Sequence, residues 1–411
     1  MSAIAYQYPD EVVGLREGLT SFIRKEVIPL HEKHAKILEN DRLKYTEKGG
    51  YSPEVVDLIR TVRMKSAEAG YYTAFAPTEL GGAGLGMVAY FGAWERVAHM
   101  CGPKYFLANF SIGHWASGPS PVIQKMTPQA REEIFPAFMS GEKSMCFGMS
   151  EPGTGSDATQ MKTRADKDGD GWRLNGGKIW TTHSPFANYA IVFAVTDQER
   201  AAEKRGGISA FLVPTTAEGF SIQQIIRMWG HVGGNEAVLH FDNVRIEPYQ
   251  LVGELNEGFR IAMLGVNIGK IFNSASAIGR ARWALEQGFE YAKLRHTFGK
   301  PIAEYQGVTF PLAEASMHVL AAHCLALNVA QLLDAGHQAR KELAMCKGFA
   351  VQTSLKAIDV VMQTHGAIGM TNEMHLTEAF IGARLSNIAD GTNEIIRRTI
   401  VKEMLGGDMD L

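Results

Sequence analysis

A change in hydrophobic period divides this chain into three stretches. Residues 8–137 carry apolar side chains at helical spacing, most clearly between Val12 and Val27 and again over residues 53–69. Residues 143–252 hold short runs rich in β-branched and aromatic side chains, such as 189–195, and these runs alternate with glycine-containing turns. The middle stretch therefore predicts a small, mostly antiparallel β-domain.

The stretch after residue 253 has few turn signals and long helical patterns. Long helices with short links predict an antiparallel bundle, with helices expected over 280–294, 311–334, 340–366 and 393–405. We therefore expect a mostly α protein with a central β-domain. Its parts would be an N-terminal helical domain (1–142), a small antiparallel β-domain (143–252) and a C-terminal helical bundle (253–411). A length of 411 residues fits this division.

Charge and composition exclude several classes of function. A formal net charge of −3 gives no basic footprint for nucleic acid or an anionic membrane surface. We see no apolar stretch long enough to span a bilayer, and residues 1–11 lack the features of a signal or transit peptide. The scattered cysteines show no metal-ligand spacing, so we expect no metal site and a reducing compartment. These observations predict a soluble, cytoplasmic protein.

The most informative motif is the glycine-rich segment 146–160, which begins with a short apolar run. Gly153 and Gly155 allow the backbone to approach a ligand closely. Ser150, Thr154 and Ser156 offer hydroxyl donors for carbonyl or phosphate oxygens. The segment therefore predicts a ligand-binding turn at the end of a strand.

A second glycine motif, at residues 84–89, fits the G-x-G-x-x-A dinucleotide fingerprint. No acid follows about 20 residues later, where a ribose would need one, and no βαβ alternation surrounds the motif. We interpret it as a loop that leads into a helix.

Three further blocks accompany the glycine-rich segment: the Trp-Thr-Thr run 180–182, the segment 295–302 and the Asp-Gly-Thr-Asn-Glu run 390–394. In order and spacing, the four blocks resemble the acyl-CoA dehydrogenase family of flavoenzymes over nearly the whole chain. The resemblance implies bound FAD, an acyl-CoA thioester as substrate, an electron-transfer flavoprotein as acceptor and assembly into a homotetramer. It also implies the same order of helical, β and helical domains that the periodicity predicts.

The resemblance assigns residues of the glycine-rich segment to the flavin. Phe147, Met149 and Ser150 would face the isoalloxazine ring, and Ser156 would contact the flavin pyrophosphate or the pantetheine arm of the substrate. Gln160 departs from the small residue that the family usually has at its position.

The resemblance also places Trp180 over the flavin ring and Thr182 close to its N5 atom. His183 and Ser184 follow where the family usually has Asn-Gly, which affects the expected contacts of this loop. As an alternative, Trp180 could be a strand aromatic packed in the core of the β-domain.

A third set of residues would reach the FAD of a neighbouring subunit. Arg295, Phe298 and Gln306 match the family block for the adenine and pyrophosphate, and an arginine fork suits a diphosphate. Gln363 and Gly366 match a second block with the same role. The expectation of an oligomer rests on these matches.

The catalytic base is the main departure from the family pattern. Most relatives have Glu before Gly-Thr, whereas this chain has Asp390, whose carboxylate is withdrawn by about 1.5 Å, one bond length. We interpret Asp390 as the base and infer an acyl group that is cyclic or branched. As an alternative, Asp390 could cap the helix expected from Asn393. Some relatives place the catalytic Glu instead on a helix around the position of Asn267. Residues 267–270 of this chain offer no carboxylate, so this alternative is excluded.

The remaining assignments complete the expected site. Thr392 and Glu394 join the cofactor-binding residues, and the substrate would meet Ser156, Asn267, Lys270 and Gly391.

The implied reaction is α,β-dehydrogenation, in which Asp390 removes the α-proton and a hydride leaves Cβ for flavin N5. Two alternatives stay open. One is a flavin oxidase of the nitroalkane-oxidase type, in which Asp390 deprotonates a nitroalkane. The other is a non-catalytic FAD-binding subunit of a hetero-oligomer.

Overall fold

The computed structural model describes residues 6–230 and 232–410, which fall into two units. The helical unit comprises Met1–Ile28, Leu85–Asn109 and Asn267–Leu411, and the sheet unit comprises Pro29–Gly84 and Phe110–Val266. Helices, strands and helices follow one another along the chain, which confirms the expected fold class. The division into three domains at residues 142 and 252 stays a prediction.

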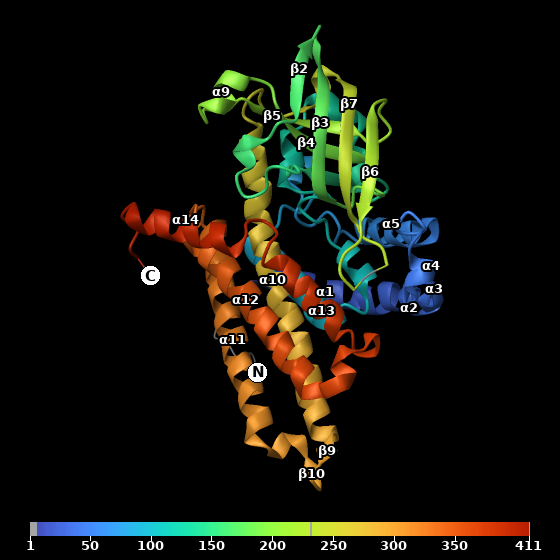
Figure 1. Cartoon of the computed structure of the whole chain (residues 1–411), viewed down its shortest axis with the longest axis vertical. Helices are drawn as coiled ribbons and strands as arrows, with labels where there is room; N and C mark the ends of the chain where they lie inside the picture. Colours follow the sequence, from blue (N-terminus) through green and yellow to red (C-terminus); the bar gives the residue numbers. More distant parts are fainter. Residues whose placement is uncertain (1–5, 231, 411) are drawn as a thin grey trace. The chain divides into compact units, whose positions relative to one another are not determined.

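The sheet unit contains one eight-stranded sheet in the order β6-β7-β3-β2-β4-β5-β8, with β1 paired to β4 (Figure 1). Most neighbours are antiparallel, but β4 pairs in parallel with β1 and, at one position, with β2. The strands are β1 (Met145–Gly148), β2 (Arg164–Asp168), β3 (Gly171–Thr182), β4 (Tyr189–Val195), β5 (Ile208–Pro214), β6 (Phe220–Ile226), β7 (Glu236–Ile246) and β8 (Leu251–Val252).

Strand β4 is buried on both faces and lies between two cores. Ile191 and Phe193 pack into a cluster that also contains Phe135 and Phe138 of α8, whereas Val192 packs into a cluster made mostly of sheet side chains. A continuous apolar run is typical of a strand that is covered on both sides. This double burial gives β1, the neighbour of β4, a rigid support.

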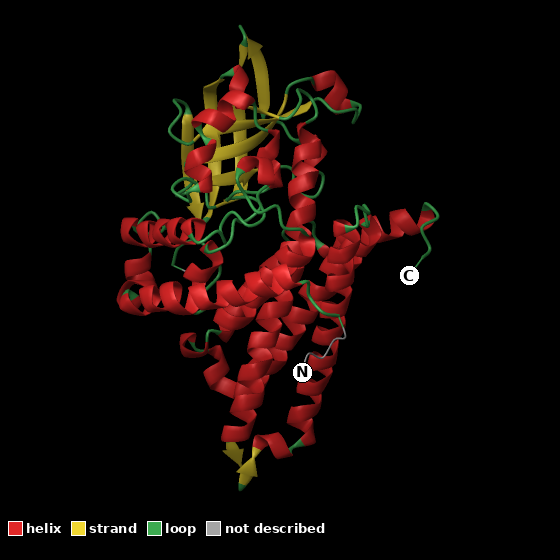
Figure 2. Cartoon of the chain, turned by 180° about the vertical axis from the view of Figure 1, so that it is seen from behind, coloured by secondary structure: helices red, strands yellow, loops and turns green. Residues whose placement is uncertain are grey.

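Short helices accompany the sheet in the same unit (Figure 2). Thr127 caps α7 by accepting a hydrogen bond from the Ala130 N–H. The helices are α3 (Ala35–Leu38), α4 (Asp41–Lys44), α5 (Pro53–Glu68), α7 (Pro128–Glu133), α8 (Phe135–Met139) and α9 (Gln198–Ala202), and α2 (Ile28–Lys33) begins at the boundary of the unit.

The helical unit is dominated by long helices that pack side by side (Figure 1). α12 contacts α11, α13 and α14, and α6 contacts α1 and α11. The elements are α1 (Asp10–Phe22), a π-helical turn (Ile23–Val27), α6 (Met87–Cys101), α11 (Gln306–Asp334), α12 (Arg340–His365), α13 (Leu376–Ser386) and α14 (Asn393–Leu405), together with the part of α10 (Gly258–Leu294) from Asn267 onward.

Two of these helices begin earlier than the sequence pattern predicted. α10 begins at Gly258 rather than near residue 280, and α11 begins at Gln306, which leaves Pro311 inside the helix. The glycines of α10 mark close packing instead of a break. At Gly279, for example, an added Cβ would lie 2.4 Å from the Glu95 carbonyl oxygen on α6.

By length and composition, α10 and α11 could cross a membrane, so the expectation of no such stretch is wrong. The most apolar window of α10 is 67% buried within the protein, as is typical of a core helix, and that of α11 is 39% buried. α11 leaves Phe310, Met317 and Leu320 exposed. Its apolar surface is therefore only partly covered within one chain.

The glycine motif at residues 84–89 leads into α6, as expected. Asp334, at the end of α11, accepts hydrogen bonds from the N–H groups of Met87 at 2.5 Å and Val88 at 2.9 Å. This carboxylate occupies the helix N-terminus that a dinucleotide phosphate would need. Residues 1–5 of the segment 1–11, which was considered above for a targeting signal, lie outside the described residues.

Candidate active site

A buried ion pair fixes the glycine-rich turn that follows β1. Lys178 on β3 is fully buried, and its Nζ lies 2.8 Å from Glu151 Oε1 and 3.2 Å from the Met149 carbonyl oxygen. Glu151 also accepts hydrogen bonds from the backbone N–H groups of Lys162 (2.6 Å) and Thr163 (2.9 Å). Burial alone would raise the pKa of Glu151, but Lys178 and these donors together lower it. Glu151 therefore acts as an ionised anchor for the turn.

A β-bulge in β3 turns Trp180 out of the sheet. Lys178 pairs with Leu239 and Thr181 pairs with Ala237, so β3 carries one extra residue against β7. Trp180 lies at this irregularity with a φ of 61°, and its side chain is 55% exposed. The alternative of a core aromatic is therefore wrong.

A backbone hydrogen bond joins the bulge to the glycine-rich turn. The Ile179 N–H donates to the Ser150 carbonyl oxygen at 2.9 Å. Two nearby hydroxyl oxygens, those of Thr154 in the turn and Thr181 in the bulge, are buried without a hydrogen-bond partner among the described residues. Buried hydroxyls without a partner are suited to hydrogen bonding with a bound ligand. The bulge and the turn therefore form one side of a candidate site in the sheet unit.

The other residues assigned to this side differ in their surroundings. Phe147 packs against the rings of Trp115 and Phe193, with centroids 4.9 Å and 4.8 Å away, so it also belongs to the core. Met149 packs against the same core. Ser156 and Thr182 are exposed. Their contacts with a flavin stay predictions.

Asp390 lies in the loop between α13 and α14, in the helical unit. Its backbone has a φ of 53° and is followed by Gly391 at 102°, a left-handed conformation that glycine adopts without strain and aspartate adopts more readily than most residues. Asn273 of α10 donates from Nδ2 to Asp390 Oδ2 at 2.7 Å and to the Gly269 carbonyl oxygen at 2.9 Å. The hydrogen bond to Asn273 therefore fixes one oxygen of the carboxylate.

Asp390 does not cap α14. The N-cap is Thr392, whose hydroxyl accepts a hydrogen bond from the Ile395 N–H at 3.4 Å. The capping alternative for Asp390 is therefore wrong. Glu394 is exposed in the first turn of α14, where a backbone hydrogen bond and then Thr392 lower its pKa. These contacts explain both residues without a ligand, so their assignment to the cofactor stays a prediction.

Two lysines surround Asp390 without forming an ion pair with it. Lys347 of α12 is fully buried, and its Nζ donates to the Gly391 carbonyl oxygen at 2.7 Å. Lys270 donates to Asn267 Oδ1 at 3.0 Å. None of the ion pairs found among the described residues includes Asp390.

The balance of burial and charge sets the protonation of this cluster. Burial raises the pKa of Asp390 to about 6, and Lys347, Lys270 and the Asn273 hydrogen bond only partly oppose it. Burial lowers the pKa of Lys347 to about 8 and also lowers that of Lys270. Asp390 can therefore change protonation state close to neutral pH.

Sequence reasoning missed Asn273 and Lys347. Both lie at helical positions whose neighbours are buried, such as Ala277 in α10 and Val351 in α12. A polar residue on a buried helix face was the available signal, because such side chains are rarely buried without a partner.

The residues assigned to a neighbour's FAD lie at one end of the helical unit. β9 (His296–Thr297) and β10 (Lys300–Pro301) form a hairpin between α10 and α11. Phe298 lies between them with a φ of 51° and is 94% exposed. Arg295 and Gln306, which flank the hairpin, are also exposed.

Gln363 and Gly366 lie close to the same end, where α12 terminates. The ring of Tyr291, near the end of α10, stacks on that of His365 at 4.3 Å, which brings the two helix ends together. Gln363 and Gly366 are exposed. The structure thus gathers both blocks and leaves them open to a second chain.

Comparison with protein families decides what these motifs belong to. The acyl-CoA dehydrogenase N-terminal domain matches residues 9–142, the middle domain matches 146–244 and the C-terminal domain matches 256–405. The chain belongs to the acyl-CoA dehydrogenase family. Members are FAD-dependent flavoproteins, and this chain is accordingly an oxidoreductase that acts on acyl-CoA.

Individual relatives agree with the family assignment. An acyl-CoA dehydrogenase of Bacillus subtilis is 32% identical, with 97% of this chain and 98% of the relative covered. The short-chain specific acyl-CoA dehydrogenase of Rattus norvegicus mitochondria is also 32% identical, covering 97% and 91%. A 3-(aryl)acrylate reductase of Clostridium sporogenes is 32% identical, covering 86% and 92%.

Solved structures show the same fold. Butyryl-CoA dehydrogenase of Megasphaera elsdenii has a TM-score of 0.82 at 25% identity, with 98% of this chain and 100% of that chain covered. A chain solved in work on the electron transferring flavoprotein of Acidaminococcus fermentans has a TM-score of 0.83 at 26% identity, with the same coverage.

Proposed function

We propose that this family member catalyses α,β-dehydrogenation of an acyl-CoA thioester, with Asp390 as the base that removes the α-proton. The observation that carries the proposal is a carboxylate near two lysines that has no direct ion pair and a pKa raised to about 6. FAD, when bound, supplies the acceptor for the hydride that leaves Cβ.

The surroundings of Asp390 suit a base that works near neutral pH. General-base catalysis is most efficient when the pKa lies close to the operating pH. Asn273 holds Oδ2, which leaves Oδ1 to take the proton. Because the aspartate side chain is short, the position of its carboxylate depends strongly on the backbone. The left-handed conformation at Asp390 and Gly391 would therefore determine how far the carboxylate reaches toward the substrate.

Removal of an α-proton also needs stabilisation of the charge that develops on the thioester oxygen. We assign this role to the Asp390 N–H, since no backbone carbonyl of the described residues accepts from it. Lys347 holds the next peptide through the Gly391 carbonyl oxygen. This contact would keep the N–H and the carboxylate in a fixed relation.

The buried hydroxyls in the sheet unit fit the polar groups of FAD. Thr154 and Thr181 each present a hydroxyl without a partner among the described residues. The exposed face of Trp180 and the hydroxyls of Ser150 and Thr182 complete a set suited to a flavin ring. Ser156 would meet the pyrophosphate or the pantetheine arm.

We propose a cyclic or branched acyl group, because a base shorter by one methylene favours an α-carbon close to the backbone. Asn267, Lys270 and Gly391 would line the path of the acyl thioester. The cellular role would then be degradation of fatty or alicyclic acids in the cytoplasm.

A homotetramer would cover the surfaces that a single chain leaves open. Arg295, Phe298 and Gln306 are exposed, as are Gln363 and Gly366, and we propose that they bind the FAD of a neighbouring subunit. The apolar residues exposed on α11 would pack in the same assembly. An electron-transfer flavoprotein is the proposed acceptor, a partner consistent with the A. fermentans structure.

An anaerobic bleaching assay tests the reaction. The purified yellow protein is mixed with butyryl-, octanoyl- and cyclohexanecarbonyl-CoA and, separately, with nitroalkanes. We expect a single fast phase with CoA esters, fastest with the cyclic ester, and no bleaching by nitroalkanes. Nitroalkane turnover with rapid reoxidation in air would instead show an oxidase. No bleaching by either class would show a non-catalytic subunit.

Dilution tests the assembly. If each FAD is bound by two subunits, the binding of FAD and the association of subunits are coupled. Arg295→Ala should therefore release FAD on dilution and move the sedimentation profile to smaller species. The exposed Lys293→Ala, near the end of α10 and two residues before Arg295, is the matched control. A monomeric wild type that keeps FAD would contradict the inter-subunit assignment.

A further inference from the structure

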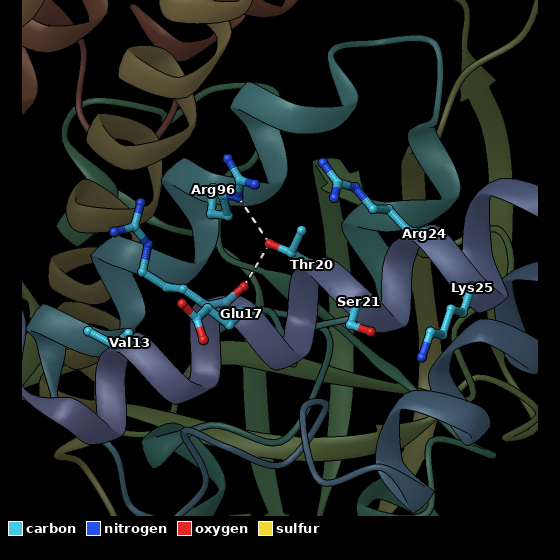
Figure 3. A pocket seen from close by; sticks show the side chains of 8 residues that line it. Val13, Glu17, Thr20, Ser21, Arg24, Lys25 and Arg96 are labelled. Atoms are coloured by element: carbon cyan, nitrogen blue, oxygen red, sulfur yellow. Dashed lines mark hydrogen bonds between the residues drawn. The ribbon is translucent and has the colours of Figure 1, made fainter. Parts of the chain in front are cut away.

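A basic hollow lies on the helical unit between α1, the π-helical turn that follows it, and α6 (Figure 3). Its volume is about 520 Å³, within the range of small-molecule sites. None of the residues assigned to acyl-CoA or FAD lines it. The lining residues are Val13, Arg16, Glu17, Thr20, Ser21, Arg24, Lys25 and Arg96.

The lining carries more positive than negative charge. Arg16, Arg24, Lys25 and Arg96 face a single acid, Glu17. Helical spacing explains the gathering, because positions three and four apart fall on one face of α1 and the turn after it. The nearby hydroxyls of Thr20 and Ser21 add neutral hydrogen-bonding groups.

The buried Glu95 behind the hollow does not balance this charge. Its carboxylate pairs with Arg282, with His323 at 3.3 Å and with Arg16 at 3.5 Å. Burial opposes ionisation, but these partners hold the pKa of Glu95 low, at about 2. One acid is therefore shared between two guanidinium groups and an imidazole, and neither Arg24 nor Lys25 forms an ion pair with it among the described residues.

Two of the guanidinium groups are held in place. Arg96 Nε donates to the Thr20 hydroxyl at 3.0 Å, and this hydroxyl donates to the Arg16 carbonyl oxygen at 2.7 Å (Figure 3). Arg16 lies over the ring of Tyr8 at 4.6 Å, and its Nε is buried without a hydrogen-bond partner among the described residues. Prepared donors of this kind lower the entropy lost when a ligand binds.

The like charges repel one another in the absence of an anion. The pKa of Arg96 is lowered by burial and by the neighbouring guanidinium groups of Arg16, Arg24 and Arg282. An anion in the hollow would relieve this repulsion. The groups around the hollow therefore point to a ligand that brings more than one negative charge.

We propose that the hollow binds a small oxyanion of the phosphate class, either free phosphate or the phosphate group of a small metabolite. Guanidinium forks match the oxygens of phosphate in pairs, and the hydroxyls of Thr20 and Ser21 suit the remaining oxygens. The lining has no aromatic ring, so the anionic group rather than a nucleobase is recognised. The site is independent of the dehydrogenation proposed above.

Binding is tested on the FAD-loaded protein by thermal unfolding and calorimetry, with inorganic phosphate and pyrophosphate as probes at constant ionic strength set by chloride. We expect a saturable rise in melting temperature with a Kd below about 1 mM. Arg24→Gln should weaken binding at least about tenfold, because it removes a positive charge from the hollow. Arg24 is exposed, so the variant should still fold. Lys402→Gln, an exposed change on α14, should leave binding unchanged.

The variants distinguish the proposal from other phosphate sites and other anions. CoA and FAD carry phosphates, so an effect that Arg24→Gln does not alter would place the anion elsewhere and overturn the proposal. A response that follows ionic strength without saturation would also overturn it. If succinate bound as tightly as pyrophosphate, the site would recognise dianions in general, and the assignment to the phosphate class would be overturned. A phosphate monoester such as glycerol phosphate tests whether a metabolite fits as well as the free ion.

Discussion

Glu151 in the sheet unit and Asp390 in the helical unit are both shielded carboxylates near lysine, yet their pKa values move in opposite directions. Glu151 has Lys178 at 2.8 Å and two backbone donors, and its pKa is lowered. Asp390 has an amide at 2.7 Å, while the nearby Lys347 is bound to a carbonyl oxygen, and its pKa is raised to about 6. The direct contact with Lys178 keeps Glu151 ionised, whereas the lysines near Asp390 do not contact its carboxylate and do not offset the effect of burial on its pKa.

The largest expected effect comes from removing the charge of Asp390. Asp390→Asn should keep FAD but lose dehydrogenation by at least several hundredfold, because the amide cannot accept the α-proton. Turnover by steady-state assay and FAD content by absorbance measure this. Asp359→Asn, an exposed change on α12, is the control. Near-normal turnover in Asp390→Asn would remove this residue from the mechanism.

Breaking the other pair should affect stability instead. Glu151→Gln leaves Lys178 buried without its partner, so the free energy of unfolding should fall by about 3 kcal/mol. Denaturant unfolding measures it, and Lys178→Met in the same background should recover part of the loss. Asp166→Asn, which breaks the exposed pair with Arg164, should change stability little. A loss as small as that of Asp166→Asn would show that the anchor is not structural.

The two acids should also give stability opposite dependences on pH. The lowered pKa of Glu151 contributes stability above its unfolded value of 4.5, and this is lost as pH falls through the lower folded value. The raised pKa of Asp390 means that the native state binds more protons between its unfolded value of 3.8 and about 6, so stability falls as pH rises through that window.

Asp390→Asn should therefore be more stable than the wild type at pH 7, by about 1 to 3 kcal/mol. Unfolding experiments at pH 5 and pH 7 check this sign. If the variant were less stable than the wild type at pH 7, the carboxylate would be a stabilising group like Glu151, and the comparison would fail.

The smallest expected effect concerns Asn273. The turnover rate of the wild type should rise with pH and level off above a midpoint near 6, as Asp390 ionises. Asn273→Val removes a donor to the carboxylate, so the midpoint should move up by less than about one pH unit. Glu151→Gln should not move it. An unchanged midpoint in Asn273→Val would show that Asn273 supports only the backbone of α10.

The sequence predicted the fold class and identified the four motif blocks, because motif spacing and hydrophobic period are local properties. The roles assigned to the residues of those blocks stay predictions. It could not predict that Lys347 reaches the Gly391 carbonyl oxygen, since the two residues are far apart in the chain and only the packing of α12 joins them. The apolar helices were misjudged in length for a related reason. The expected helix began at residue 280, directly after Gly279, whereas in the fold Gly279 lies inside α10 and allows this helix to approach α6 closely.

Because of the bulge, the direction of the Trp180 side chain depends on the number of residues in β3 relative to β7. Substitution at position 180 changes the side chain that is presented but leaves it directed outward. Deletion of one neighbouring residue would remove the extra step and reverse the faces of the side chains beyond it. During divergence, a point change at position 180 therefore keeps the outward direction of the side chain, whereas a single insertion or deletion in β3 would be retained only with a second change that restores the number of residues.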